Sequence, residues 1–135
     1  MQKSTGTANG PEPKGPGPGA PVQAAKPLVS VVLREVLESL PKGEKQELRV
    51  IVGNLQPGDR TPRHSHRFPV TVYVLEGAFT LELEGCEPIM ISAGETLIEP
   101  PHVNMVGSNR SASDPLKLVM FYVSDPDTPF ADVAQ

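Results

Sequence analysis

The sequence has few aromatic residues, one cysteine and no long hydrophobic run. Aromatic residues make up 4% of the 135 positions, and tryptophan is absent. The single Cys86 has no partner for an internal disulfide, which is typical of a reducing compartment. No apolar stretch reaches the ~18 residues of a membrane span, and the first residues do not form the apolar core of a signal peptide. These absences predict a cytoplasmic protein with no membrane partner.

The sequence also has fewer basic than acidic side chains. The chain carries 12 lysine and arginine side chains against 16 aspartates and glutamates, a net charge of −4. Binding of nucleic acid needs a basic surface that neutralises phosphates. The balance of charge therefore predicts that nucleic acid is not a partner.

The first 27 residues differ in composition from the rest. From Gly10 to Pro27 the chain reads GPEPKGPGPGAPVQAAKP, with almost no large apolar side chain. Such a segment cannot bury enough surface to offset an ordering entropy of ~1–2 kcal/mol per residue. We predict a disordered Pro/Gly-rich tail over residues 1–27 and one folded domain over residues 28–135, which is long enough for a compact core.

Short apolar runs separated by turn signals fill the predicted domain. Nearly every run stops at glycine or proline, and the third alternates apolar with polar residues. Strands with regularly spaced turns are typical of an all-β sandwich or barrel. The predicted strands are Leu48–Leu55, Val70–Glu76, Ala78–Glu84, Pro88–Ser92, Thr96–Glu99 and Leu116–Val123.

One segment of the predicted domain fits two structures. Residues 31–40 read VVLREVLESL, with apolar residues spaced as on an amphipathic helix that Pro41 would end. The same segment can begin as a strand leading into the sheet, which the β-rich surroundings favour.

His64 and His66 form the most distinctive pair in the chain. Two histidines at i and i+2 on a strand point to the same face. Facing into a barrel, two imidazoles can chelate one metal ion, although such a pair can also be purely structural. Gly58 before the pair and Gly77 after the following strand strengthen the functional interpretation.

This stretch resembles the first motif of the cupin superfamily. The motif places Gly before His-x-His, then Glu and a second Gly, and Gly58, His64, His66 and Gly77 fall in register. Part of the second motif is also in register, at Gly94, Pro100 and Asn109. The resemblance spans roughly residues 48–123. It implies a small RmlC-like cupin: an all-β jelly-roll barrel, the cupin-type double-stranded β-helix, often dimeric, with a ligand or metal inside.

The sequence departs from the family in its metal ligands. Val70 stands in the glutamate slot and Met105 in the slot of the last histidine, so His64 and His66 are the metal ligands that remain by position. His102 and Glu99 are candidate substitutes. His102 is either a turn residue with a solvated ring or a third imidazole, and Glu99 can serve only if it turns inward. If His64 and His66 are the only protein ligands, we predict that a divalent transition metal binds weakly.

Other residues around the pair predict a binding pocket. Arg60, Arg63 and Arg67 surround the histidines, either as a solvated face or as a pocket mouth that attracts an anion. Arg63 and Arg67 should point away from the face that His64 and His66 share. The apolar lining is predicted to come from Val70, Val72, Val74 and Met105, with Met105 also fitting simple core packing.

Three functions from different classes follow. The first is a small-molecule-binding cupin barrel with a weakly metal-binding His-x-His pocket, for which an anionic small molecule is the candidate ligand. The second is a metal-dependent enzyme, of oxygenase or isomerase type, acting on a small anionic substrate. The third is a metal-free structural or interaction cupin, since a fold does not fix a function. We also expect a homodimer, with the segment near Val31 as the edge exchanged between copies.

Overall fold

Nine β-strands and no helix make up residues 28–135, the part of the chain that the computed structural model describes. The predicted tail over residues 1–27 lies outside the described residues. Residues 33–135 form one compact unit. No helix in the described range is long and apolar enough to cross a membrane. The strands are β1 (Glu47–Leu55), β2 (His64–Ser65), β3 (Val70–Glu76), β4 (Ala78–Leu83), β5 (Ile89–Ser92), β6 (Thr96–Glu99), β7 (Met105–Ser108), β8 (Leu116–Ser124) and β9 (Asp132–Val133).

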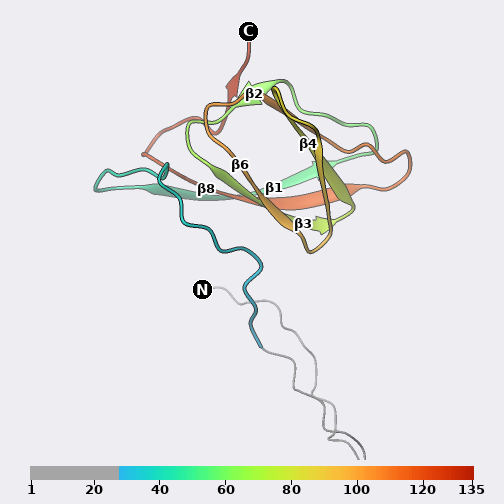
Figure 1. The fold of residues 1–135 in the computed structure, drawn as a ribbon, viewed down its shortest axis with the longest axis horizontal. Coiled ribbons are helices and arrows are strands. Elements are labelled where there is room, and N and C mark those ends of the chain that lie inside the picture. The colour runs from blue at the N-terminus through green and yellow to red at the C-terminus, as the bar shows by residue number, and fades with distance from the viewer. Residues whose placement is uncertain (1–27) are drawn as a thin grey trace, which may run out of the picture. The chain divides into compact units, whose positions relative to one another are not determined.

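The strands form two antiparallel sheets (Figure 1). One sheet has the order β1-β8-β3-β6, and the other has the order β5-β4-β7-β2-β9. Non-consecutive strands lie next to each other in both sheets, as in a jelly roll, in which two sheets close over one core. The predicted all-β double-sheet fold is confirmed.

The core lies between the sheets and follows the two-residue period of the strands. On β3, Val70, Val72 and Val74 are fully buried, while Thr71 and Tyr73 between them face the other side. From the second sheet, Phe79 and Leu81 point into the same core. This alternation is the one that the sequence predicts for a strand with one buried face.

The strand register sets which polar side chains enter the core. β6 pairs with β3 so that Glu99 lies directly opposite Val70. β2 pairs with β7 so that His64 lies opposite Met105. Directly opposed residues on neighbouring antiparallel strands share a face of the sheet. Glu99 and His64 therefore point to the interior.

A glycine is required at the tight turn between β3 and β4. Gly77 has φ 83°, and a Cβ on it would collide with the carbonyl oxygen of Pro115. Only glycine adopts this left-handed conformation without a steric penalty. The turn explains why the predicted strands Val70–Glu76 and Ala78–Glu84 are separated at this point.

Neither predicted structure for residues 31–40 is present. The segment has no helix and no strand, and Val36 is 95% exposed. An isolated helix this short is marginal in water, because its stability comes mainly from packing an apolar face. Val32 and Leu40, on the same face as Val36, are also 54% and 41% exposed, so this face is not buried. Sequence patterns also missed β2, β7 and β9, which have two to four residues each.

The outer side of the four-stranded sheet is apolar. Leu48, Val50 and Val52 on β1 are between 54% and 67% exposed, and their neighbour Phe121 on β8 is 39% exposed. β1 is also the edge of its sheet. We call this surface the outer face.

Candidate metal centre

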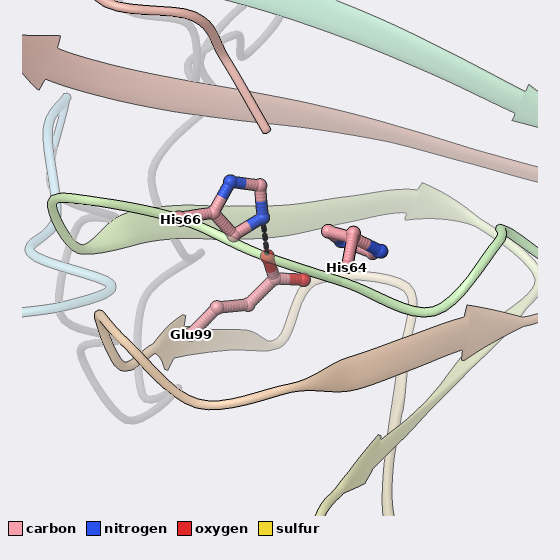
Figure 2. A group of neighbouring side chains, drawn as sticks. All are labelled: His64, His66 and Glu99. Atoms are coloured by element: carbon pink, nitrogen blue, oxygen red, sulfur yellow. Dashed lines mark ion pairs between the residues drawn. The ribbon is translucent and has the colours of Figure 1, made fainter. Parts of the chain in front are cut away.

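His64, His66 and Glu99 meet inside the barrel. His64 begins β2, His66 follows that strand, and Glu99 ends β6, so the two sheets contribute to one cluster (Figure 2). One ligand atom from each residue lies within 4.8 Å of the other two. His66 is 1% exposed and Glu99 is 4% exposed. Of the two alternatives left open for Glu99, the structure has the inward one.

The polar atoms of His66 are unusually arranged. Its Nδ1 lies 2.6 Å from the carbonyl oxygen of Phe130. A carbonyl can only accept, so Nδ1 carries the proton and Nε2 of the neutral ring holds a lone pair. That buried Nε2 lies 3.1 Å from Oε1 of Glu99 but has no aligned hydrogen-bond donor or acceptor among the described residues. Two acceptors therefore face each other, and either a second proton on the ring or a bound cation relieves the contact.

His64 is oriented in the same way. Its Nδ1 lies 2.7 Å from the carbonyl oxygen of Pro62, which leaves Nε2 to act as a ligand. The two imidazole rings are T-shaped, with centroids 4.9 Å apart. Metal-binding histidines usually donate their other ring N–H to a carbonyl or carboxylate, which fixes the tautomer. Both histidines already have this second hydrogen bond.

The three side chains fit a divalent transition metal. Two imidazole nitrogens and one carboxylate are a donor set typical of non-haem iron(II) and of catalytic zinc. Ligand bonds of about 2.1 Å place neighbouring ligands of a facial or tetrahedral site about 3.0–3.4 Å apart. The 3.1 Å between Nε2 of His66 and Oε1 of Glu99 matches that spacing, and the ligand atoms, which all lie within 4.8 Å of one another, need to move closer together on binding. Three protein ligands also leave further coordination positions open.

A cavity of about 90 Å³ adjoins the cluster. Its polar end is formed by the three candidate ligands and Thr61, and the rest is apolar. Gly107 lies beside Phe79 on the neighbouring strand, so close that a Cβ on it would lie 2.8 Å from the ring. The apolar and glycine positions that line the cavity are Gly53, Leu55, Phe79, Gly107, Leu118, Met120 and Phe130.

The predicted apolar lining lies elsewhere. Val70, Val72, Val74 and Met105 belong to the fully buried core cluster, not to the residues that line the cavity. Short β-branched side chains on a central strand are covered by the opposite sheet, which fills the space beside them. Met105 keeps its position opposite His64 but is packed as core.

His102 lies outside the cluster. It is exposed, with φ 64°, in the turn after β6, and histidine is one of the residues that tolerate this region. Its backbone N–H donates to the carbonyl oxygen of His66 at 2.8 Å. Of the two alternatives for His102, the structure has the turn residue.

The arginines around the histidines point away from the cavity. Arg60 lies 3.9 Å from Glu82, Arg63 lies 2.8 Å from Glu84, and none of the three lines the cavity within the described residues. Arg67 donates twice to Asp132, with both distances 3.0 Å. These hydrogen bonds lower the pKa of the Asp132 carboxyl.

Sequence reasoning missed Phe130 and most of the cavity wall. Phe130 lies in an irregular stretch after β8, where no periodic pattern marks a buried position. A signal for Glu99 did exist. In the run Thr96–Glu99, two-residue alternation puts Glu99 on the same face as Leu97, which packs against the core.

A family model described as a cupin domain matches residues 51–122, more than half of the chain. An RmlC-like cupin family protein with a double-stranded β-helix fold, from Methanocaldococcus jannaschii, is 30% identical to this chain. The match covers 67% of this chain and 81% of that one, with a TM-score of 0.51. The comparison with curated proteins gave no match.

More distant structures share the fold alone. A cupin-like protein from Thermotoga maritima is 21% identical, with 64% of each chain covered and a TM-score of 0.56. The DMSP lyase DddQ from Ruegeria pomeroyi is 18% identical, with a TM-score of 0.57. That match covers 64% of this chain but 43% of the lyase, so this chain spans less than half of that enzyme.

Proposed function

The chain belongs to the cupin family, and from this premise we propose that it binds a divalent transition metal and a small molecule at one site. His64, His66 and Glu99 hold the metal, and the adjoining cavity receives the molecule. The observation that carries the proposal is the buried contact between Nε2 of His66 and Oε1 of Glu99, 3.1 Å apart with no aligned donor between them. A cation placed there satisfies both acceptors at once.

The position of the Glu99 carboxylate supports this proposal. The family places its glutamate in the slot that Val70 occupies here, and Glu99 lies directly opposite Val70 on the neighbouring strand. Opposed residues in an antiparallel pair have Cβ atoms only about 4.5–5.5 Å apart. A glutamate side chain can therefore reach the same region from either position.

The cavity favours a compact ligand that is mostly apolar. About 90 Å³ holds only a few non-hydrogen atoms, and most of the wall is aliphatic or aromatic. The predicted attraction of an anion cannot come from Arg60, Arg63 or Arg67, whose partners are surface carboxylates. A divalent ion beside one carboxylate keeps one net positive charge. A ligand with one anionic donor atom and a small apolar body fits this charge and shape.

A metal-dependent enzyme is the second candidate. Three protein ligands leave coordination positions open, and catalytic metal sites keep such a position whereas structural sites close it. A bound ion supplies Lewis-acid chemistry or, for a redox-active metal, activation of dioxygen, as the oxygenase or isomerase alternatives require. The third alternative, a metal-free structural cupin, is less well supported because the barrel keeps a cavity at the cluster.

Chelator-stripped protein tests the metal site directly. We expect one equivalent of zinc(II) or cobalt(II) to bind the parent chain, measured in competition with a chromophoric chelator. His64→Ala should reduce affinity strongly, and His102→Ala, the matched control at an exposed histidine, should not. Equal binding by the parent and His64→Ala would contradict the proposal.

Azide tests the open coordination position. Added to the cobalt(II)-loaded chain, this small monoanion should change the visible absorption of the metal if a position faces the cavity. An unchanged spectrum at millimolar azide would indicate a closed site and would remove support for both the ligand site and the enzyme.

We further propose that two copies pair through the outer face. The four strands have nine, nine, seven and four residues, and at about 3.4 Å per residue and about 4.8 Å between strands they give roughly 470 Å² of flat area. A standard interface buries about 800 Å² per partner. The apolar centre of the face has no charged side chain, so two identical copies do not repel there. This moves the expected contact from the segment near Val31 to β1.

The predicted cytoplasmic location stays a prediction, which cell fractionation tests.

A further inference from the structure

The last residues of the chain pair with β2, the strand that begins at His64. After β8 the chain turns back, and β9 pairs with β2, with Val133 opposite His64 and Asp132 opposite Ser65. The N–H of Ala134 donates to the carbonyl oxygen of Arg63 at 2.9 Å. The C-terminus thus leaves the fold beside β2 (Figure 1). We call residues 125–135 the strap.

Phe130 is the residue of the strap that contacts the metal centre. Its carbonyl oxygen accepts a hydrogen bond from the Nδ1–H group of His66, with an N–O distance of 2.6 Å. Its ring packs on that imidazole, with centroids 4.8 Å apart, and lines the cavity. The tautomer of a neutral histidine is set by the hydrogen bond that one nitrogen makes. The strap therefore decides that Nε2, the nitrogen facing Glu99, carries the lone pair.

Polar contacts on both sides of Phe130 hold the strap in place. On one side, Nη2 of Arg49 donates to the carbonyl oxygen of Thr128 at 2.7 Å. On the other side, the guanidinium of Arg67 donates twice to Asp132, and both side chains are partly exposed. β9 has only two residues and lies at the edge of its sheet. The buried part of the strap is the ring of Phe130, which packs against the core and stands edge-on to Tyr122 with centroids 5.2 Å apart.

We infer that the strap is a positioning element for the metal centre. The carbonyl of Phe130 fixes the tautomer of His66, and the Arg67–Asp132 pair fastens the strap over β2. The effect on metal affinity rests on the proposed function, whereas the effect on the tautomer does not. Arg67, Asp132 and the carbonyl of Phe130 act through His66 and do not contact the metal, whereas the ring of Phe130 also lines the cavity.

The tautomer can be read without any metal. In the full chain with ¹⁵N-labelled histidine, long-range proton–nitrogen NMR spectra should show both His64 and His66 protonated at Nδ1. A chain that ends at Pro129 should lose this fixed state at His66 alone. His64 is the internal control, because its Nδ1 donates to Pro62, outside the strap. An unchanged His66 spectrum in a folded truncated chain would overturn the inference.

A charge reversal tests the fastening if the truncated chain does not fold. Asp132→Arg places two guanidinium groups together and should shift His66 away from the Nδ1-protonated form. Combining it with Arg67→Asp restores an opposite pair and should restore the tautomer, which general destabilisation would not do. Glu84→Arg is the matched control, since it breaks a surface ion pair of the same kind, between Arg63 and Glu84, whose side chains are both outside the strap. A His66 spectrum that Asp132→Arg leaves unchanged would contradict the role of the pair.

Zinc(II) affinity provides the second measurement. Loss of a hydrogen-bond partner behind a ligating histidine typically weakens metal binding about 10–100-fold. We expect zinc(II) affinity to fall by this factor in the truncated chain. We expect it to recover in the double variant that combines Asp132→Arg with Arg67→Asp. If no variant, including the parent, binds zinc(II), the proposed function fails, and the NMR spectra still decide whether the strap sets the tautomer. Equal affinity of the parent and the folded truncated chain would contradict the positioning role.

Discussion

Glu99→Gln should have opposite effects on the metal-free and the metal-loaded protein. In the metal-free chain, the lone pair of His66 Nε2 lies 3.1 Å from a buried carboxylate oxygen. Glutamine has the same shape but offers an N–H donor in that place. One new buried hydrogen bond contributes about 0.5–1.5 kcal/mol, and an acceptor–acceptor contact is removed. We therefore expect the free energy of unfolding without metal to rise by about 1 kcal/mol.

The same substitution should weaken metal binding by about two orders of magnitude. Structural zinc sites bind with about 10–16 kcal/mol over four ligands, or roughly 3 kcal/mol per ligand. Since about 1.4 kcal/mol corresponds to a tenfold change in affinity, replacing the carboxylate by a neutral amide should raise the dissociation constant about 100-fold.

Thermal unfolding with and without chelator measures both effects. For a domain of this size, 1 kcal/mol shifts the Tm by roughly 4 °C or more. Glu99→Gln should melt higher than the parent in chelator and lower than the parent at saturating zinc(II). Glu76→Gln, an exposed carboxylate at the end of β3, is the control and should change neither Tm appreciably. A fall in the Tm of Glu99→Gln in chelator would show that Glu99 is held by a donor, such as a doubly protonated His66, and would refute the reasoning.

Three further predictions follow from the core, the turn and the outer face. Met105→His should raise zinc(II) affinity, because the new imidazole would start directly opposite His64, and chelator competition measures it; unchanged affinity would mean that this position does not face the metal. Gly77→Ala should destabilise the fold by at least about 2 kcal/mol, because alanine at φ 83° is strained and its Cβ meets Pro115; chemical denaturation measures the loss, and a change below 0.5 kcal/mol, the range of neutral surface sites, contradicts it. Light scattering at micromolar concentration should give twice the 14.4 kDa mass for the parent and a monomer for Val50→Lys, and a parent mass of 14.4 kDa refutes the dimer.

The sheets were predictable because their strands are long and have one buried face. The run Val70–Glu76 has the observed bounds of β3, and Leu48–Leu55 differs from β1 by one residue. The strands β2 and β9 have two residues each, which is too short to show a period, and they exist because neighbouring strands pair with them. The prediction of a helix or strand over residues 31–40 was wrong for the opposite reason. The pattern of this segment is strong, but Val32, Val36 and Leu40 on its apolar face stay exposed.

Two of the three ligands of the metal centre could be predicted from their spacing alone, His64 and His66. Glu99 is also a candidate from the sequence, but only the register that sets it opposite Val70 shows that it points inward. The contribution of Phe130 is a backbone carbonyl, which any residue type supplies, so no sequence pattern points to it. The cavity walls depend on which side chains the two sheets bring face to face, and that is a property of packing.

The account depends most on whether His64, His66 and Glu99 hold one metal ion together. The most direct measurement is isothermal titration of zinc(II) into the chelator-stripped parent chain, repeated for His64→Ala, Glu99→Gln and His102→Ala. The account predicts one equivalent bound by the parent and by His102→Ala, with affinity lowered about 100-fold in Glu99→Gln and further reduced or lost in His64→Ala. No binding by the parent, or equal binding by all four chains, would contradict it.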